Sequence, residues 1–169
     1  MGGMTLSNAT VPLDVIQLPV LEDIIAIVVH PHFDLPTVQA RAALPKEIPL
    51  NLAVKQWRNV AAFITAVYEK KYQRLGNYME DFIIEPARQH LIPGFLDVKK
   101  AAIENGAIFC SISGGGPSVF AFSVDSQNAS AIGLAMKHAF QKNNIGSDVF
   151  ISRINTIGAK LVKDEDAIY

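Results

Sequence analysis

Two stretches of the sequence carry arginines whose spacing suits the binding of a small anion. In TVQAR, Thr37 and Arg41 are four residues apart and share one face of a predicted helix. In EPARQHLIPG, Arg88 follows Pro86 in a segment interrupted by prolines. A guanidinium group forms planar, bidentate pairs with a carboxylate or a phosphate. A single arginine is more commonly a solvated surface charge, so this pair indicates a ligand only if the two segments meet in space.

A run of three glycines, Gly114, Gly115 and Gly116, separates two apolar stretches in SISGGGPSVFAF. A hairpin turn explains glycines that supply positive φ, but a two-residue turn needs at most two of them. Successive glycine N–H groups also form a concave nest for an anion, and a bare backbone lets a ligand come close. The local pattern leaves the hairpin turn and the ligand-facing loop both open.

The composition is that of a globular protein with one core. Half of the 169 residues are apolar, and the formal net charge is −1. A chain without a basic field is not expected to bind nucleic acid, and no apolar run approaches the ~20 residues of a membrane span. Cys110, the single cysteine, lies in the apolar run AIFCSI and is expected to be a buried hydrophobic residue. We therefore expect a reducing, cytoplasmic setting.

Hydrophobic periodicity predicts an α+β domain. The predicted strands are 24–30, 107–113, 118–124 and 148–154, with 158–162 as an additional edge strand. The predicted helices are 37–44 with Asp34 as its cap, 50–75 ending at Gly76, 77–84, 95–106 and 126–143. The order β, several helices, β, β, α, β is that of a ferredoxin-like split β-α-β sandwich with inserted helices, in which helices cover one face of an antiparallel sheet.

Taken together, TVQARAALP, EPARQHLIPGF and SISGGGPSVFAF closely resemble the homoserine kinases of the GHMP kinase superfamily, in this order and at these intervals. The glycine loop resembles the third motif of the superfamily, and the arginine segments resemble the homoserine branch. Relatives often have Ser-Gly-Ser-Gly-Pro-Thr in this loop, so Gly115 and Ser118 depart slightly. The resemblance runs from about Gly2 to about Val162 and implies the GHMP kinase C-terminal domain.

Members of that family begin with another domain, which carries a Pro-x-x-x-Gly-Leu-Gly-Ser-Ser phosphate loop. No such motif occurs in this sequence. We therefore expect residues 1–20 to be a remnant of the N-terminal domain or a linker, and residues 21–169 to form the C-terminal domain. The chain alone is expected to be inactive, and an uncovered domain interface favours a homodimer.

The resemblance also implies a reaction and a division of roles. Homoserine kinases transfer the γ-phosphoryl group of ATP, with Mg²⁺, to the hydroxyl of L-homoserine, a step in threonine biosynthesis. By resemblance, Arg41 and Arg88 hold the α-carboxylate of homoserine, Thr37 lines the pocket, and Gly114, Gly115 and Gly116 present bare backbone to it. ATP and Mg²⁺ would be bound mainly by the missing half, so no catalytic residue or metal ligand is assigned here.

Two other functions stay open: a stand-alone ferredoxin-like domain that binds an amino acid for regulation, and a GHMP kinase acting on another small molecule. Other residues have ordinary explanations. His30 and His32 fit a loop edge better than a zinc site, because a third ligand is not evident. Glu85 is expected to orient Arg88 or to cap a helix, and Trp57 is expected to pack in the core or at a domain interface.

Overall fold

The computed structural model describes residues 2–159 and 161, and its main element is a four-stranded antiparallel sheet. The strand order is β4-β5-β3-β6. The strands are β3 (Ile25–Pro31), β4 (Phe109–Ile112), β5 (Val119–Ser123) and β6 (Ser147–Arg153). This is the predicted ferredoxin-like arrangement, in which the first and third strands of the split motif lie side by side in the centre.

The β-branched run of β3 forms a central strand, as predicted. Ile27 is paired with Ala121 of β5 on one side and with Ile151 of β6 on the other. Ile25, Ile27 and Val29 are buried, whereas the alternate residues are only half-buried. Burial on both faces was predicted, but only one face of β3 is completely covered, because side chains alternate between the two faces of a strand.

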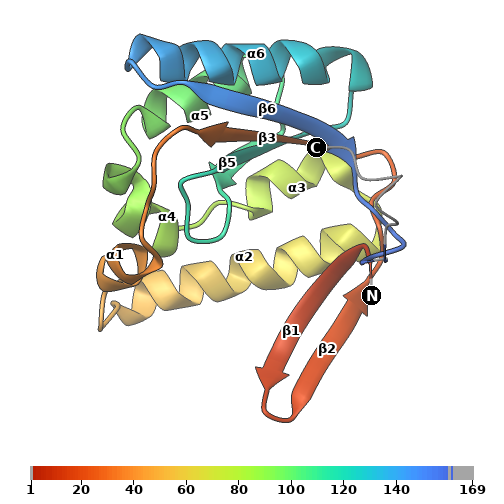
Figure 1. Cartoon of the computed structure of the whole chain (residues 1–169). Helices are drawn as coiled ribbons and strands as arrows, with labels where there is room; N and C mark the ends of the chain where they lie inside the picture. Colours follow the sequence, from red (N-terminus) through yellow and green to blue (C-terminus); the bar gives the residue numbers. More distant parts are fainter. Residues whose placement is uncertain (1, 160, 162–169) are drawn as a thin grey trace.

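Two helices, α5 (Phe95–Glu104) and α6 (Ser126–Lys142), cover the fully buried face (Figure 1). Asp125 caps α6 by accepting a hydrogen bond from the Gln127 N–H at 2.8 Å. Gly133 lets α6 approach the sheet closely, since a Cβ there would lie 2.7 Å from Val149 Cγ1. The main core lies between these two helices and the sheet.

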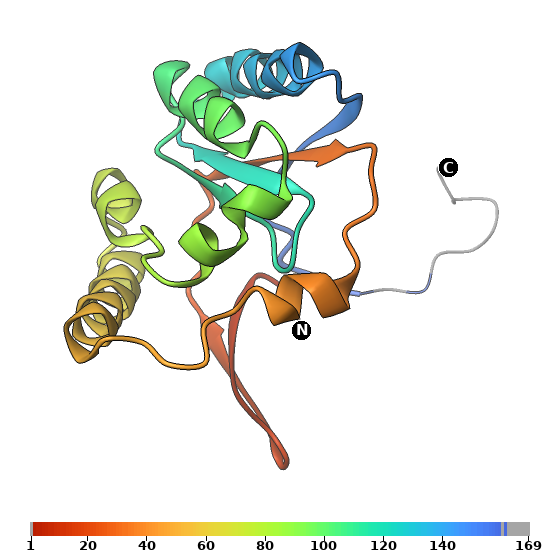
Figure 2. The same cartoon turned by 90° about the vertical axis from the view of Figure 1, so that its left-hand side faces the viewer.

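The inserted helices α2 (Leu50–Tyr68) and α3 (Tyr72–Tyr78) lie on the opposite side of the sheet (Figures 1 and 2), so the prediction that helices cover only one face is wrong. The prediction of one helix over 50–75 is wrong, because the chain leaves the helix at Lys70, where φ is +54°. Gly76 does not break a helix. It lies inside α3, where a Cβ would come within 2.1 Å of the Ile108 carbonyl oxygen, so a close approach of two backbones requires glycine there.

Two further predictions about this part of the chain are also wrong. The helix predicted over 77–84 is absent, because α3 ends at Tyr78 and the next helix, α4 (Ile84–Arg88), begins only at Ile84. Short helix α1 (Thr37–Ala42) is present, but Asp34 does not cap it; Pro36 occupies the N-cap position without a side-chain hydrogen bond. A 3-10 turn, η1 (Gln89–Leu91), links α4 to α5.

The first residues form a separate antiparallel hairpin, β1 (Met4–Thr10) and β2 (Leu13–Leu18), which projects away from the rest (Figure 2). At the other end, residues 158, 159 and 161 are not in a strand, and residues 160 and 162 of the predicted edge strand lie outside the described residues. Among the helices that the structure describes, none is long and apolar enough to cross a membrane.

Candidate functional site

Arg88 connects the two other segments that carry predicted site residues. Its Nε donates a hydrogen bond to the Ala40 carbonyl oxygen at 2.9 Å, and its Nη1 donates to the Gly114 carbonyl oxygen at 3.0 Å. Ala40 belongs to α1, and Gly114 belongs to the loop between β4 and β5. Helix α1, helix α4 and the glycine loop therefore meet at one end of the molecule (Figures 1 and 2). We call the place defined by Ala40, Arg88 and Gly114 the arginine corner.

The end of α1 explains why Arg88 finds an acceptor there. The last four carbonyl groups of a helix have no partner within the helix. The Gln39 and Arg41 carbonyls accept hydrogen bonds from the N–H groups of residues 43 and 44, and the Ala40 carbonyl accepts one from Arg88. One guanidinium group thus satisfies one helix-end carbonyl and links it to the glycine loop.

Thr37 and Arg41 lie on α1 beside this corner, and both are exposed. Within the described part of the chain, neither side chain is recorded in a hydrogen bond or ion pair, in contrast to Arg88. Arg41 directly follows Ala40, so its backbone belongs to the corner. The structure therefore brings the three predicted segments together, and the contact of the two guanidinium groups with one ligand stays a prediction.

The glycine loop is a closed turn between β4 and β5. The Ser113 N–H donates to the Ser118 carbonyl at 2.8 Å, and the Gly116 N–H donates to the Ser113 carbonyl at 3.0 Å. Gly114 and Gly116 have φ of +59° and +83°, whereas Gly115 does not have positive φ. The hairpin geometry therefore accounts for two of the three glycines.

The surroundings of these glycines differ along the loop. A Cβ on Gly116 would lie 3.1 Å from both Ile92 Cδ1 and Leu35 Cδ2, so that residue faces the packed core. A Cβ on Gly115 would be 3.9 Å from the Ala40 Cβ, an ordinary contact, and a Cβ on Gly114 would meet nothing within 4 Å. The backbone at 114–115 consequently borders open space beside the arginine corner.

Glu85 is not paired with Arg88, contrary to one of the two expectations for it. Its side chain is buried, its Oε1 forms an ion pair with Lys99 Nζ of α5, and its Oε2 accepts a 2.5 Å hydrogen bond from the Ser111 hydroxyl of β4. The other expectation, capping, applies to a different residue. Asp81 accepts hydrogen bonds from the N–H groups of Ile83, Ile84 and Glu85 at 2.8–3.1 Å.

Sequence reasoning did not identify Ser111, Lys99 or Asp81. An acidic residue shortly before a helix is a capping signal that could have pointed to Asp81. No comparable signal exists for Ser111 and Lys99, because a buried ion pair is visible only once the three elements have been placed.

The two histidines make separate polar contacts near the end of β3. His30 Nδ1 lies 2.8 Å from the Ser118 hydroxyl, and His32 Nε2 lies 2.9 Å from Asp148 Oδ2. The hydrogen bond with His32 lowers the pKa of Asp148. Among the described residues, three or more His, Cys, Asp or Glu side chains nowhere gather as a metal site would require.

The prediction of burial is confirmed for Cys110 but not for Trp57. Cys110 is fully buried, and desolvation raises the pKa of its thiol to about 12, so it is a structural residue. Trp57 is 63% exposed and therefore does not pack in the core of this chain.

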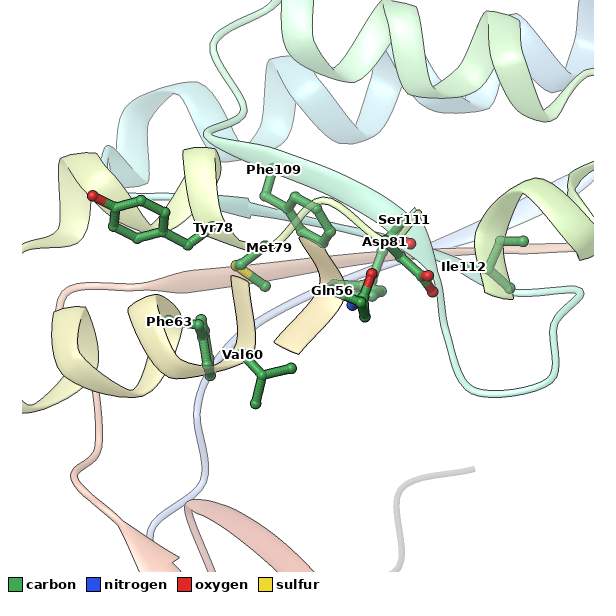
Figure 3. A pocket seen from close by; sticks show the side chains of 10 residues that line it. Gln56, Val60, Phe63, Tyr78, Met79, Asp81, Phe109, Ser111 and Ile112 are labelled. Carbon is green, nitrogen blue, oxygen red and sulfur yellow. The ribbon is translucent and has the colours of Figure 1, made fainter. Parts of the chain in front are cut away.

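A cavity of about 320 Å³ lies between α2, α3 and the strands β4 and β5 (Figure 3). Its lining is mainly apolar and aromatic and includes Val60, Phe63, Met79 and Phe109. None of the predicted site residues lines it. Gln56 and Asp81 at its edge accept hydrogen bonds from backbone N–H groups, so these polar groups are used within the fold. The cavity is therefore distinct from the arginine corner.

Comparison with known proteins identifies the domain. Residues 63–142 match the family model described as "GHMP kinases C terminal". The crystal structure of homoserine kinase from Cytophaga hutchinsonii superposes with a TM-score of 0.89 at 49% identity, covering 91% of this chain and 49% of that one. The fold is that of the GHMP kinase C-terminal domain. A mevalonate kinase from L. major shares this fold with a TM-score of 0.64 at 14% identity, over 84% of this chain and 46% of that one.

Curated proteins extend the similarity over nearly the whole chain. Homoserine kinase of Chlorobium phaeobacteroides is 45% identical over 164 residues, which are 96% of this chain and 51% of the relative. Homoserine kinase of Arabidopsis thaliana is 39% identical over 96% of this chain and 45% of the relative. The chain thus spans about half the length of the curated relatives it matches.

Proposed function

We propose that this domain is the substrate-binding half of a homoserine kinase, which transfers the γ-phosphoryl group of ATP to the hydroxyl of L-homoserine and yields O-phospho-L-homoserine for threonine biosynthesis in the cytoplasm. The observation that carries the proposal is the arginine corner, in which Arg88 joins α1 to the glycine loop. Identities of 39–45% to homoserine kinases over 96% of the chain support the choice of substrate.

Arg88 has donors left for a ligand. A guanidinium group has five N–H donors, and the contacts to Ala40 and Gly114 use two of them. In the proposal, the remaining donors bind the α-carboxylate of homoserine together with Arg41, and Thr37 lines the same pocket. Gly114 and Gly115 present bare backbone to the substrate, so the short substrate reaches the main chain. Gly116 contributes by shaping the loop, because its N–H already donates to the Ser113 carbonyl.

This half of the enzyme binds and orients the substrate. Phosphoryl transfer depends mainly on positioning and on stabilising charge. ATP with Mg²⁺ supplies the phosphoryl group. The described residues gather no set of three metal-ligating side chains, so they do not fit a complete Mg²⁺ site, and we assign no step through it to this chain. On this proposal the isolated domain binds homoserine without phosphorylating it.

The test uses a longer protein that joins this chain to an N-terminal half with the phosphate loop, assayed for ATP-dependent phosphorylation of homoserine. Arg88→Ala is expected to raise the homoserine KM by at least about 30-fold, because loss of a charge-assisted contact to a carboxylate costs roughly 2–5 kcal/mol. The ATP KM should change less than about twofold. Arg58→Ala, which removes an exposed arginine of α2, is the matched control and should leave both constants unchanged. An unchanged homoserine KM in Arg88→Ala would contradict the proposal.

A regulatory amino-acid-binding domain is the second candidate, because residues of this chain form the arginine corner by joining Arg88 to Ala40 and Gly114. The two candidates differ in one measurement. If the joined protein binds homoserine by calorimetry but transfers no phosphate from ATP, the regulatory function is supported and the kinase function is not.

A further inference from the structure

We propose that Glu85 is a positioning residue: through Ser111 and Lys99 it sets where the Arg88 guanidinium lies relative to the glycine loop. The inference rests on the proposed function for its kinetic consequence. Its structural part concerns only contacts within this chain.

Glu85 and Arg88 lie one turn apart on α4, so their side chains leave the same side of the helix. Both side chains form hydrogen bonds with the same segment, residues 111–114. Glu85 accepts from the Ser111 hydroxyl at 2.5 Å, and Arg88 donates to the Gly114 carbonyl, three residues further on, at 3.0 Å. Two attachments along one run prevent α4 from sliding or rotating against β4 and the loop.

Lys99 stabilises the buried Glu85 carboxylate by an ion pair. The Glu85 side chain is 8% exposed, and a carboxylate at such a position is very unfavourable unless it is paired and hydrogen-bonded. Lys99 pairs with Oε1 while Ser111 donates to Oε2, so each carboxylate oxygen has its own partner. The carboxylate is thereby held in one orientation by α5 and β4.

Asp81 stiffens the start of the same segment, where it accepts hydrogen bonds from three backbone N–H groups of residues 83–85. Residues 81–88 are therefore held together at their beginning by Asp81 and attached to other elements by Glu85 and Arg88. An arginine already held in its binding orientation loses less side-chain entropy when a carboxylate arrives. Glu85 would thus favour binding without touching the ligand.

A purely structural role for Glu85 would lower stability without a specific effect on Arg88, so the first experiment measures the Arg88 side chain directly. Hydrogen exchange of the Arg88 Nε–H, which donates to Ala40, is followed by NMR on this chain. In Glu85→Gln, the amide group has one acceptor atom for the two donors, Lys99 and Ser111, so one attachment is lost. Exchange of the Nε–H is expected to become about tenfold faster, because one charge-assisted hydrogen bond that holds α4 is lost.

Two further variants make this result decisive. Glu104→Gln makes the same chemical change in the exposed Lys100–Glu104 pair of α5 and should leave the Arg88 exchange rate unchanged. Ser111→Ala removes only the β4 attachment, keeps the ion pair, and should also speed exchange, so the proposal stays testable if Glu85→Gln does not fold. Unchanged exchange in both Ser111→Ala and a folded Glu85→Gln would overturn the proposal.

The second experiment uses the joined kinase and a double-mutant cycle. Glu85→Gln is expected to raise the homoserine KM about tenfold with little change in the ATP KM, and to have no further effect on the homoserine KM when Arg88 is already alanine. Equal effects of Glu85→Gln with and without Arg88 would overturn the positioning role. If the wild-type joined protein does not phosphorylate homoserine at all, the proposed function fails, whereas the exchange experiment still decides the structural part.

Discussion

The two faces of the four-stranded sheet are covered to very different degrees by this chain. Towards α5 and α6 the core is continuous. Its fully buried residues, with 0% of their surface exposed, include Ile27, Val29, Ile132 and Phe140. Towards α2 a smaller core cluster, in which Val67 and Leu75 are fully buried, lies beside the cavity of about 320 Å³, and Trp57 is 63% exposed. The difference indicates that the α5–α6 face provides most of the stability of the fold, while the α2 face contributes less per residue.

Truncation of a large side chain on the closed face should have the largest effect. Phe140→Ala is expected to lower the free energy of unfolding by about 4 kcal/mol, because it removes a fully buried ring and leaves a cavity. Trp57→Ala on α2 is the matched change on the other face and should cost less than about 1 kcal/mol. Urea denaturation of this chain measures both values, and similar losses in the two variants would contradict the comparison.

The Glu85–Lys99 pair, which contacts Ser111 of the edge strand β4, tests the effect of burial with charge in place of volume. Lys99→Met leaves the buried carboxylate of Glu85 without its cation and is expected to cost about 3 kcal/mol. Lys100→Met removes the neighbouring lysine, whose pair with Glu104 is exposed at 3.8 Å, and should cost no more than about 0.5 kcal/mol. Equal losses for the two neighbouring lysines would show that burial of the pair has no energetic consequence.

The glycine loop repeats the contrast on a smaller scale. Gly116→Ala should lower the free energy of unfolding by about 2 kcal/mol, because φ is +83° and the new Cβ would press on Ile92 and Leu35. Gly115→Ala should be nearly neutral for stability, since its Cβ would meet only Ala40 at 3.9 Å. In the joined kinase, however, Gly115→Ala should weaken homoserine binding, as titration calorimetry would show. Unaltered binding would mean that the substrate does not approach this backbone.

The smallest expected effect concerns the exclusion of water from the Cys110 thiol on the face of the sheet that α5 and α6 cover. Its folded-state pKa is raised to about 12 by burial, so its contribution to stability is fully present below the unfolded thiol pKa and is lost as the pH rises through about 12. At a pH of about 9.5 the loss is about 1 kcal/mol, given an unfolded pKa of about 8.5. The free energy of unfolding should fall less steeply with rising pH in Cys110→Ala than in the wild type. Identical slopes would mean that water reaches the thiol.

Much of the fold follows from local pattern. The β-branched run that forms β3, the alternating strands on either side of the glycines, and the end of α5 near Gly106, where φ is +96°, were all predicted from side-chain periodicity and turn residues. The errors concern boundaries that contacts between distant segments decide. Glycine is a residue type that commonly ends helices, yet Gly76 lies inside a helix. Glycine is needed there because the backbone at Ile108 packs against it.

The sequence by itself determined the order of the four sheet strands and of the helices α1, α5 and α6, together with the three segments of the arginine corner, because periodicity, turn residues and motif spacing are local properties. Only the tertiary structure decided that Arg88 binds the carbonyls of Ala40 and Gly114 and that Glu85 pairs with Lys99 and Ser111. The physical reason is that a buried charge or a free helix-end carbonyl takes whichever partner the packing brings within reach. Those partners lie 14–48 residues away along the chain, beyond any local pattern.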